Sequence, residues 1–259
     1  MTGNNRGIIL QDRDLHLFKE TGVVLRVIDR ELAKCVAGFG STTRANSRLL
    51  QLYRAGFLRR FFLGTIGGAR KALYALSPKA AALVEIPYRG PRRASDQTLA
   101  ADFFVTHQLW INQVYCLLKY HPIPVAEVRF VRWLGFHEPL LSGVPLIPDG
   151  YAELATPTKN LGMFLEVDLG HESRSVWQKK VQGYLQYAVS GSFAKQFGQA
   201  QFRTIVLASS ERRLASLRAA TAAVTEKIFW FATLDAVMSQ GFWSQIWQRP
   251  RGTEQQPLL

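Results

Sequence analysis

The stretch STTRANSRLLQ, residues 41–51, decides how the first part of the chain folds. Ser41 and Thr42 are good helix N-caps, and apolar Ala45 and Leu49 follow at helical spacing. The stretch therefore predicts a helix that runs to about Ala55. Its opposite face and flanks carry side chains able to bond base edges and phosphates: Thr43, Arg44, Asn46, Ser47, Arg48 and Gln51.

The neighbouring segments place this helix third in a small domain. Residues 11–20 and 27–36 have helical periodicity, and glycines end both segments. Residues 58–63 and 71–76 read as two strands joined by a glycine-rich turn, and residues 78–84 as a short closing helix. Three helices followed by a hairpin predict a winged helix-turn-helix over residues 8–86.

In such a domain the third helix enters the DNA groove and contacts bases through its N-terminal half. We expect Arg44 and Ser47 to read bases. Basic side chains on the helix flank and on the hairpin would hold phosphates without reading sequence: Arg48, Arg59, Arg60, Arg70 and Lys71. The alternative is a winged helix that contacts another protein and leaves its basic face solvated.

The distribution of charge favours the DNA interpretation. The net charge is +13, and residues 1–97 hold 17 Lys and Arg against 7 Asp and Glu, so +10 belongs to the N-terminal part. A concentrated positive field suits phosphate backbones. We expect double-stranded DNA as the partner, and a homodimer, because helix-turn-helix proteins commonly read palindromic half-sites.

The remaining sequence predicts an α/β domain with a mixed sheet. Residues 87–97 have the composition of a linker, residues 98–248 form the second domain, and residues 249–259 look like a loose tail. A helix over residues 98–119 is followed by strands over 125–133, 146–154 and 161–167. The domain is completed by a helix of about 17 residues from Ser173, a strand over 204–208, a helix over 211–225 and a strand over 228–233.

Acidic residues gather on two consecutive predicted strands. Asp149 follows Pro148, and Glu166 and Asp168 lie near the end of the next apolar strand, on one face of it. Hard oxygen ligands that converge in this way are typical of a Mg²⁺ or Mn²⁺ site for phosphodiester cleavage. The alternative is that these are ordinary polar groups at strand ends.

This pattern resembles the PD-(D/E)xK nuclease superfamily, whose motif is PD followed by an acidic residue, a spacer and Lys. Asp149 and Glu166 match, but Asp168 stands where the superfamily has Lys. The resemblance implies a restriction-endonuclease-like domain with Asp149, Glu166 and Asp168 as metal ligands. Lys180, on one helix face with Tyr184 and Tyr187, is the candidate for the missing catalytic cation, and Lys179 is a weaker one.

The whole arrangement resembles the replication-relaxation family of plasmids and other mobile elements. The likeness rests on the N-terminal winged helix, PDGY at 148–151, FLEVDLG at 164–170 and Lys180 before Tyr184, and spans about residues 10–235. It implies a role in replication, mobilisation or gene control. Two hypotheses follow: a DNA-binding protein that nicks or cuts DNA with Mg²⁺, or a non-catalytic regulator whose nuclease-like domain serves dimerisation or partner binding.

The cysteines, the absence of long apolar segments and the tryptophans allow three further predictions. Cys35 and Cys116 lack metal-ligand spacing and predict reduced, packed thiols. Neither a signal peptide nor a stretch of about 18 apolar residues is present, so we expect a cytoplasmic protein with no membrane contact. Trp230, Trp243 and Trp247 are expected in the core or at an oligomer contact, rather than as platforms for bases.

Overall fold

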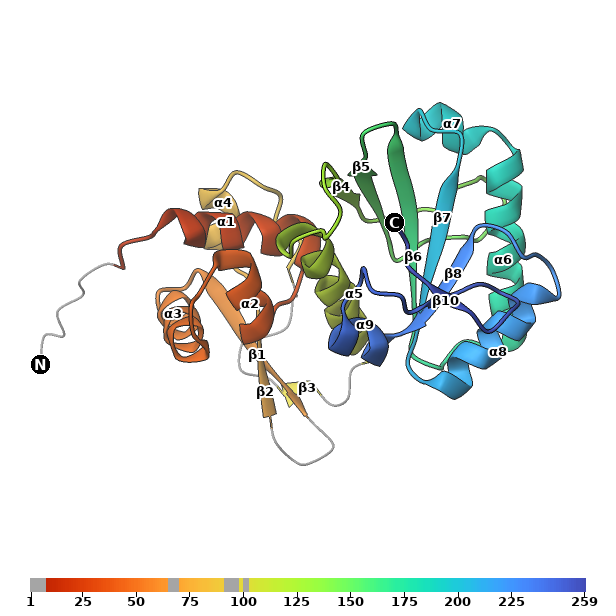
Figure 1. Ribbon diagram of the computed structural model, residues 1–259. Coiled ribbons are helices and arrows are strands. Elements are labelled where there is room, and N and C mark those ends of the chain that lie inside the picture. The colour runs from red at the N-terminus through yellow and green to blue at the C-terminus, as the bar shows by residue number, and fades with distance from the viewer. Residues whose placement is uncertain (1–7, 65–69, 91–97, 100–102) are drawn as a thin grey trace, which may run out of the picture. The chain divides into compact units, whose positions relative to one another are not determined.

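The computed structural model of the chain describes residues 8–64, 70–90, 98–99 and 103–259 (Figure 1). Internal contacts divide the chain into two units, Met1–Cys116 and Leu117–Leu259. The division was expected within residues 87–97, and instead falls inside helix α5 (Phe103–Tyr120), most of which belongs to unit 1. Residues 91–97 of the expected linker lie outside the described residues.

Unit 1 begins with helices and continues with a small sheet. Its helical elements are α1 (Asp12–Glu20), the π-helix η1 (Thr21–Leu25), α2 (Arg30–Ala37), α3 (Thr42–Arg54) and α4 (Pro78–Leu83). Its strands are β1 (Leu58–Gly64), β2 (Arg70–Leu76) and β3 (Thr98–Leu99), in the order β2-β1-β3. The three helices and the hairpin thus occur in the predicted order.

Local side-chain bonds explain where the first helices start. The Ser41 hydroxyl accepts from the Arg44 backbone N–H at 3.2 Å, so Ser41 is the N-cap of α3, as expected. The helix predicted over residues 27–36 begins only at Arg30, because Asp29 caps it with a 2.9 Å bond from the Leu32 N–H. Ile28 is extended and pairs with Tyr74.

The hairpin pairs β1 with β2 antiparallel, from Leu58 opposite Leu76 to Gly64 opposite Arg70. Its turn, residues 65–69, lies outside the described residues. The prediction of a helix that starts at Thr98 is wrong at its first residues, because Thr98 and Leu99 pair in parallel with β1. Cys35 is half-buried and Cys116 is buried, and neither forms a disulfide within the described residues.

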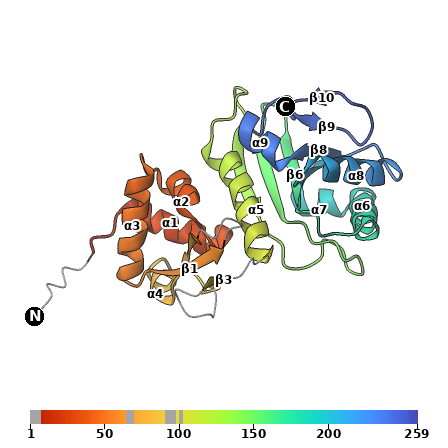
Figure 2. The same ribbon diagram turned by 90° about the horizontal axis from the view of Figure 1, so that it is seen from below.

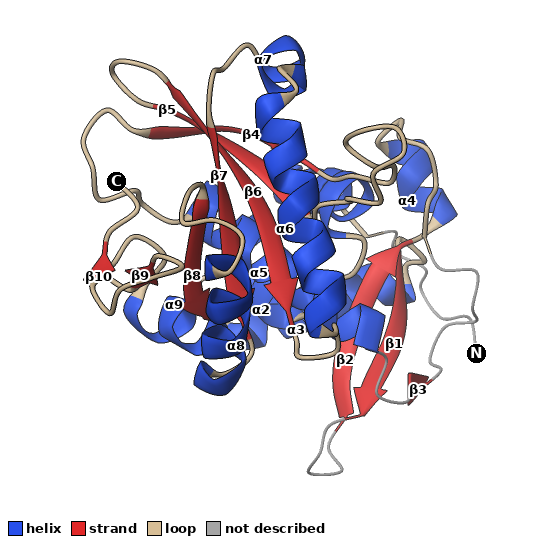
Figure 3. Ribbon diagram, turned by 90° about the vertical axis from the view of Figure 1, so that its right-hand side faces the viewer, coloured by secondary structure: helices blue, strands red, loops and turns tan. Residues whose placement is uncertain are grey.

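Unit 2 is built on a seven-stranded mixed sheet in the order β10-β9-β8-β7-β6-β5-β4 (Figure 3). Its strands are β4 (Arg129–Leu134), β5 (Gly150–Ala155), β6 (Asn160–Asp168), β7 (Phe202–Ala208), β8 (Phe229–Thr233), β9 (Trp247–Gln248) and β10 (Gln255–Gln256). Its helices after α5 are α6 (Arg174–Val189), α7 (Ser192–Phe197), α8 (Glu211–Ala222) and α9 (Leu234–Gln240). The protein is therefore a mixed α/β protein, as predicted.

Strand direction changes in the middle of this sheet. The β4–β5 and β5–β6 pairs are antiparallel, whereas the β6–β7 and β7–β8 pairs are parallel. Parallel strands need crossover connections, and α6 and α8 supply them. These two helices pack side by side on one face of the sheet (Figure 2).

The core beneath α6 and α8 is aromatic. Trp177 and Tyr184 of α6 pack onto Phe164 of β6 and Phe229 of β8, and all four are fully buried or nearly so. The Trp177 indole N–H donates to the Thr221 hydroxyl at 2.9 Å, which satisfies its polar atom inside this core. The packing fixes the rotation of α6 and thereby directs its polar side chains to the end of β6.

The C-terminal residues are part of the sheet. The prediction of a loose tail over residues 249–259 is wrong, because β10 pairs with β9 and Leu258 is only 1% exposed. Leu258 supplies the apolar anchor, and its carbonyl accepts a bond from Arg203. Helices α7 and α9 and strand β9 were also not anticipated, since each is short.

Candidate nucleic-acid interface and acidic centre

Helix α3 separates its apolar and polar side chains cleanly. Ala45, Leu49 and Leu52 are fully buried. The side chains predicted to face DNA from the N-terminal half of the helix and its flank are exposed: Thr43, Arg44, Asn46, Ser47 and Gln51. The structure therefore leaves the predicted base-reading side chains, Arg44 and Ser47, accessible.

Two of the predicted phosphate-binding residues are engaged in ion pairs within unit 1. Arg48 donates from Nε to the Asp14 carboxylate at 3.0 Å, and Asp14 is fully buried. A hydrogen bond to Asp14 raises the pKa of Arg48, against the effect of its partial burial. Lys71 pairs with Asp29, the N-cap of α2. Both cations hold helices in place, a role that helical spacing alone did not indicate.

The other predicted phosphate contacts lie on the hairpin. Arg59 donates to the Tyr88 hydroxyl at 3.0 Å, and the Arg60 guanidinium lies 4.4 Å from the centre of the Tyr53 ring. Both are half-buried, whereas Arg70 at the start of β2 is exposed. Arg70, Lys71 and Asn46 also line a cavity of about 540 Å³ between α2, α3 and β2.

The acidic centre forms where β5 begins beside the end of β6. The Asp149 backbone N–H donates to the Leu165 carbonyl at 3.0 Å, and its carboxylate accepts from the Val167 N–H at 2.7 Å. Asp149 is thereby fixed next to Glu166, as the predicted hairpin required. The Trp133 ring packs directly against Gly150, and only glycine fits there because a Cβ would lie 2.2 Å from that ring.

Glu166 is buried, with 2% of its surface exposed, and both of its carboxylate oxygens are hydrogen-bonded. The Tyr184 hydroxyl donates to one at 2.6 Å, and Lys180 Nζ donates to the other at 2.9 Å. Burial raises the pKa of Glu166 to about 7, although Lys180 acts in the opposite direction; the negative charge of Asp149 adds to the rise. The carboxyl is therefore poised to change protonation near neutral pH.

Lys180 bridges two carboxylates. Its ammonium lies 2.9 Å from Glu166 and 2.6 Å from Glu172, and its side chain is 20% exposed. Burial acts to lower the pKa of Lys180, but Glu166, Glu172 and Asp149 outweigh it, and the pKa is raised. Lys180 thus carries a positive charge beside Glu166, as the resemblance to the nuclease superfamily implied. Glu172 was not anticipated, because it lies in the connection between β6 and α6.

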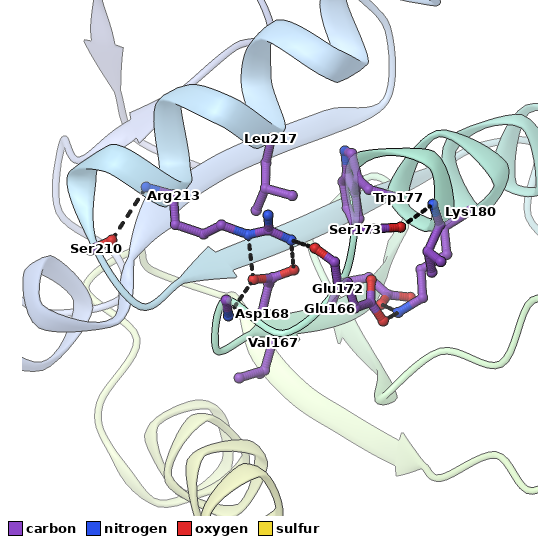
Figure 4. A network of polar contacts seen from close by, with 12 residues as sticks. Glu166, Val167, Asp168, Glu172, Ser173, Trp177, Lys180, Ser210, Arg213 and Leu217 are labelled. Atoms are coloured by element: carbon purple, nitrogen blue, oxygen red, sulfur yellow. Dashed lines mark hydrogen bonds and ion pairs between the residues drawn. The ribbon is translucent and has the colours of Figure 1, made fainter. Parts of the chain in front are cut away.

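Asp168 makes a separate ion pair with Arg213 of α8 (Figure 4). Arg213 donates from Nε at 2.7 Å and from a terminal nitrogen at 2.6 Å, and the Gly170 N–H donates to the same carboxylate at 2.7 Å. Asp168 is 5% exposed. Sequence reasoning missed Arg213, which lies 45 residues away in the chain and meets Asp168 only because β6 and β7 are parallel neighbours.

The centre therefore consists of Asp149, Glu166, Glu172 and Lys180, with the Asp168–Arg213 pair beside it. In the described part of the chain, no three His, Cys, Asp or Glu side chains are grouped so that they could hold a metal ion. The role of Asp149, Glu166 and Asp168 as joint ligands of Mg²⁺ or Mn²⁺ stays a prediction.

The fold and the centre define an α/β protein with a buried carboxylate–lysine site at the edge where β6 ends. A family model described as replication-relaxation matches residues 25–201, more than half of the chain. The chain belongs to this family, as the motifs at residues 148–151 and 164–170 indicated. Membership connects it with the replication of mobile elements.

No curated protein and no solved structure shows significant similarity to the chain. Among the residues that the structure describes, none of the helices is both long and apolar enough to cross a membrane. The cytoplasmic location and the homodimer stay predictions.

Proposed function

We propose that the protein binds double-stranded DNA through α3, as part of the replication or control of a mobile element. The observation that carries the proposal is the exposed polar face formed by Thr43, Arg44, Asn46, Ser47 and Gln51 over a buried apolar face. Unit 1 would act as a winged helix, with α3 in the major groove and the β1–β2 hairpin beside it. A major groove of about 12 Å admits such a helix.

The proposal divides the basic residues into three roles. Arg44 and Ser47, in the first half of α3, read base edges. Arg59, Arg60 and Arg70 contact phosphates from the hairpin. Arg48 and Lys71 support the helices, since their charges are already paired with Asp14 and Asp29.

Matched arginine variants of α3 test this function. Arg44→Ala should lower discrimination between a selected binding site and a scrambled duplex by about 1 to 3 kcal/mol, because a bidentate contact to a base is lost. Arg54→Ala removes the same charge from the exposed C-terminal end of the helix and should leave discrimination unchanged. Fluorescence anisotropy with both duplexes measures the difference. Equal losses in the two variants would assign the effect to charge alone and refute base reading by Arg44.

A second candidate function is metal-dependent cleavage of DNA at the acidic centre. It is favoured by the position of Lys180 Nζ, 2.9 Å from Glu166, with Asp149 fixed on the adjacent strand. Carboxylate oxygens are the ligands that Mg²⁺ prefers, and one or two protein carboxylates often suffice. Each carboxylate oxygen has a second lone pair, so Asp149 and Glu166 fit such an ion. Asp168 is left out because it accepts three hydrogen bonds, two from Arg213 and one from the Gly170 N–H, whereas Glu166 accepts two.

In this candidate, Asp149 and Glu166 would hold Mg²⁺ or Mn²⁺, which supplies Lewis-acid stabilisation of phosphoryl oxygens when bound. Lys180 stands beside Glu166 to stabilise negative charge on the phosphate. Glu172 orients Lys180 from the other side through its 2.6 Å contact.

Conversion of supercoiled plasmid to nicked circles, with Mg²⁺ or Mn²⁺, tests the second candidate. Asp149→Asn and Lys180→Met should abolish nicking, and Asp235→Asn, at an exposed position of α9, should retain it. Absence of nicking by the wild type with either ion would refute metal-dependent DNA cleavage at the acidic centre. That result would favour the regulator, in which unit 2 serves dimerisation or partner binding, and would leave DNA binding by α3 intact.

A further inference from the structure

Unit 2 has a groove at the end of the sheet where β6 and β7 begin. A cavity of about 610 Å³ is lined by residues 159–161 and 197–203, and one of about 490 Å³ by Ala188, residues 200–203, residues 227–228, Trp230 and Arg249. Both linings contain residues 200–203, so the two cavities adjoin. We call this region the amino-end groove.

The groove lies far from the acidic centre. Gly162 pairs with Phe202 at the groove end of β6 and β7, and Asp168 pairs with Ala208 at the other end. Six residues of strand at about 3.3 Å each separate the two ends by roughly 20 Å. A ligand in the groove is therefore not a ligand of the acidic centre.

The charge of the groove has one sign. Lys159, Arg203, Lys227 and Arg249 contribute cations, and neither lining includes an Asp or Glu. The C-terminal 162 residues as a whole carry only +3, from 15 Lys and Arg against 12 Asp and Glu, so this concentration is local. A concave surface with cations alone focuses a positive potential.

Trp230 fixes two of these cations. The Arg203 and Arg249 guanidiniums lie 4.9 and 4.6 Å from the centre of its ring. Because both guanidiniums stack on it, the ring serves as their support rather than as a platform for a base. Trp230 was predicted, with Trp243 and Trp247, to lie in the core or at an oligomer contact; it is half-buried and supports the two arginines.

Neither arginine is neutralised by a carboxylate in the described residues. Arg203 bonds to the Leu258 carbonyl, and Arg249 donates to the Glu226 carbonyl at 2.8 Å. Burial lowers the pKa of both guanidiniums, and for Arg203 the charge of Arg249 adds to the effect. Two partly desolvated like charges without a counter-ion are electrostatically unsatisfied, and an anion would relieve this.

We propose that the amino-end groove binds the phosphodiester backbone of DNA, as a second contact site besides α3. Planar, pre-oriented guanidiniums match phosphate oxygens, and the exposed Lys159 and Lys227 flank them on both sides. The cations extend over two adjoining cavities, a span suited to successive phosphates of a strand rather than to one free phosphate. The inference rests on the proposed DNA-binding function and adds the contribution of unit 2.

The test uses the full chain and the double variant Lys159→Gln/Lys227→Gln. Both side chains are exposed and make no hydrogen bond or ion pair within the described part of the chain, so the variant should fold and keep its thermal midpoint. Its affinity for a 30-bp duplex, an oligonucleotide length of about three helical turns, is measured by anisotropy at several salt concentrations. The slope of log affinity against log salt should become shallower by about 1.8, for two lost phosphate contacts.

A matched control removes two exposed cations outside both cavities, Lys195→Gln/Arg212→Gln, and should keep the wild-type slope. Arg203→Lys, which retains charge but loses the planar fork, should weaken binding with little change of slope. Should the groove variant keep the wild-type slope, or the control lose as much, the groove proposal is overturned. If the double variant does not fold, the two single variants are compared with their single controls by the same criterion.

Two further measurements distinguish DNA backbone binding from free-phosphate binding in the groove, and failure of the groove proposal from failure of the proposed contact by α3. Inorganic phosphate, added at constant ionic strength, should not displace the duplex at millimolar concentration; displacement from wild type but not from the groove variant would make the groove a free-phosphate site and overturn the proposal. Arg44→Ala in the same assay tests α3 independently. A loss in the groove variant with none in Arg44→Ala would refute DNA contact by Arg44 and keep the groove.

Discussion

Arg44 and Arg48 lie one helical turn apart on α3, in different surroundings. Arg44 is exposed, whereas the Arg48 side chain is 14% exposed and bound to buried Asp14. Two arginines on one helix therefore differ: Arg44 is free to make the proposed contact with DNA, whereas Arg48 supports the helix. The surroundings, rather than the residue type, determine the role.

Arg48→Ala should lower the free energy of unfolding by about 3 to 5 kcal/mol, because it leaves the Asp14 charge buried without a partner. Urea denaturation followed by circular dichroism measures the loss. Arg44→Ala is the control and should change stability by less than about 0.5 kcal/mol, as is usual for exposed positions. Equal stability of the two variants would show that the pair contributes nothing to folding.

Glu166 gives stability a pH dependence that the variant Glu166→Gln should remove. Its pKa is about 7 in the folded chain and 4.5 as an ordinary carboxyl, so between these values the folded state retains a proton that the unfolded state releases. The contribution of Glu166 is therefore fully present below pH 4.5 and is lost as the pH rises through about 7. The free energy of unfolding of the wild type should decline across this window.

Denaturation midpoints measured across that window check the sign. Glu166→Gln should show a shallower decline than wild type, and Glu138→Gln, at an exposed position, should match wild type. A steeper decline in Glu166→Gln would mean that the carboxyl is ionised in the folded state throughout.

At the scale of elements, Asn112 joins helix α5 to the irregular segment after η1. Its amide donates to the carbonyls of Leu25 and Val27, each at 2.7 Å, and the side chain is fully buried. Leu25 ends the π-helix, and its carbonyl also accepts from the Val27 backbone N–H at 2.6 Å. Asn112 thus adds a second donor to the Leu25 carbonyl and supplies one to the Val27 carbonyl, in the irregular segment before α2.

Asn112→Leu should destabilise the protein by about 1 to 3 kcal/mol, because the Val27 carbonyl loses its side-chain donor and the Leu25 carbonyl loses one of its two donors. Thermal unfolding followed by circular dichroism measures the shift. Gln113→Leu, at the half-buried neighbouring position, is the control. An unchanged midpoint in Asn112→Leu would show that water replaces the amide.

The elements that the sequence predicted well are those with local signals. The cap at Ser41 and the buried face of α3 follow from spacing over a few residues, and the placement of Lys180 beside Glu166 follows from the resemblance to the nuclease superfamily. What could not be predicted depends on distant neighbours. Asp14 captures Arg48 from another helix, and Arg213 reaches Asp168 through the parallel pairing of β6 and β7.

At the scale of the whole molecule, the chain end completes the sheet of unit 2. Leu258 is buried, although polar residues around it gave the segment the composition of a tail. Periodicity analysis cannot identify a two-residue strand such as β10, because so short a run has no period. Its position depends on β9, with which it pairs.

Leu258→Ala should therefore cost about 2 to 5 kcal/mol of unfolding free energy, the usual range for a buried leucine. Gln255→Ala, at an exposed position of β10, should cost less than about 0.5 kcal/mol. Chemical denaturation of both variants measures the difference. A negligible effect of Leu258→Ala would mean that the end of the chain is detached in solution.

The Asp168–Arg213 pair opposes the replacement of Asp168 by lysine, the residue that the nuclease superfamily has at this position. A lysine introduced there alone would face the Arg213 guanidinium in a nearly closed space, so the intermediate would carry two repelling cations. Replacement of Asp168 by lysine therefore needs a second, compensating substitution of Arg213 on α8. Asp168→Lys alone should therefore give a less stable protein than Asp168→Lys combined with a neutral residue at position 213.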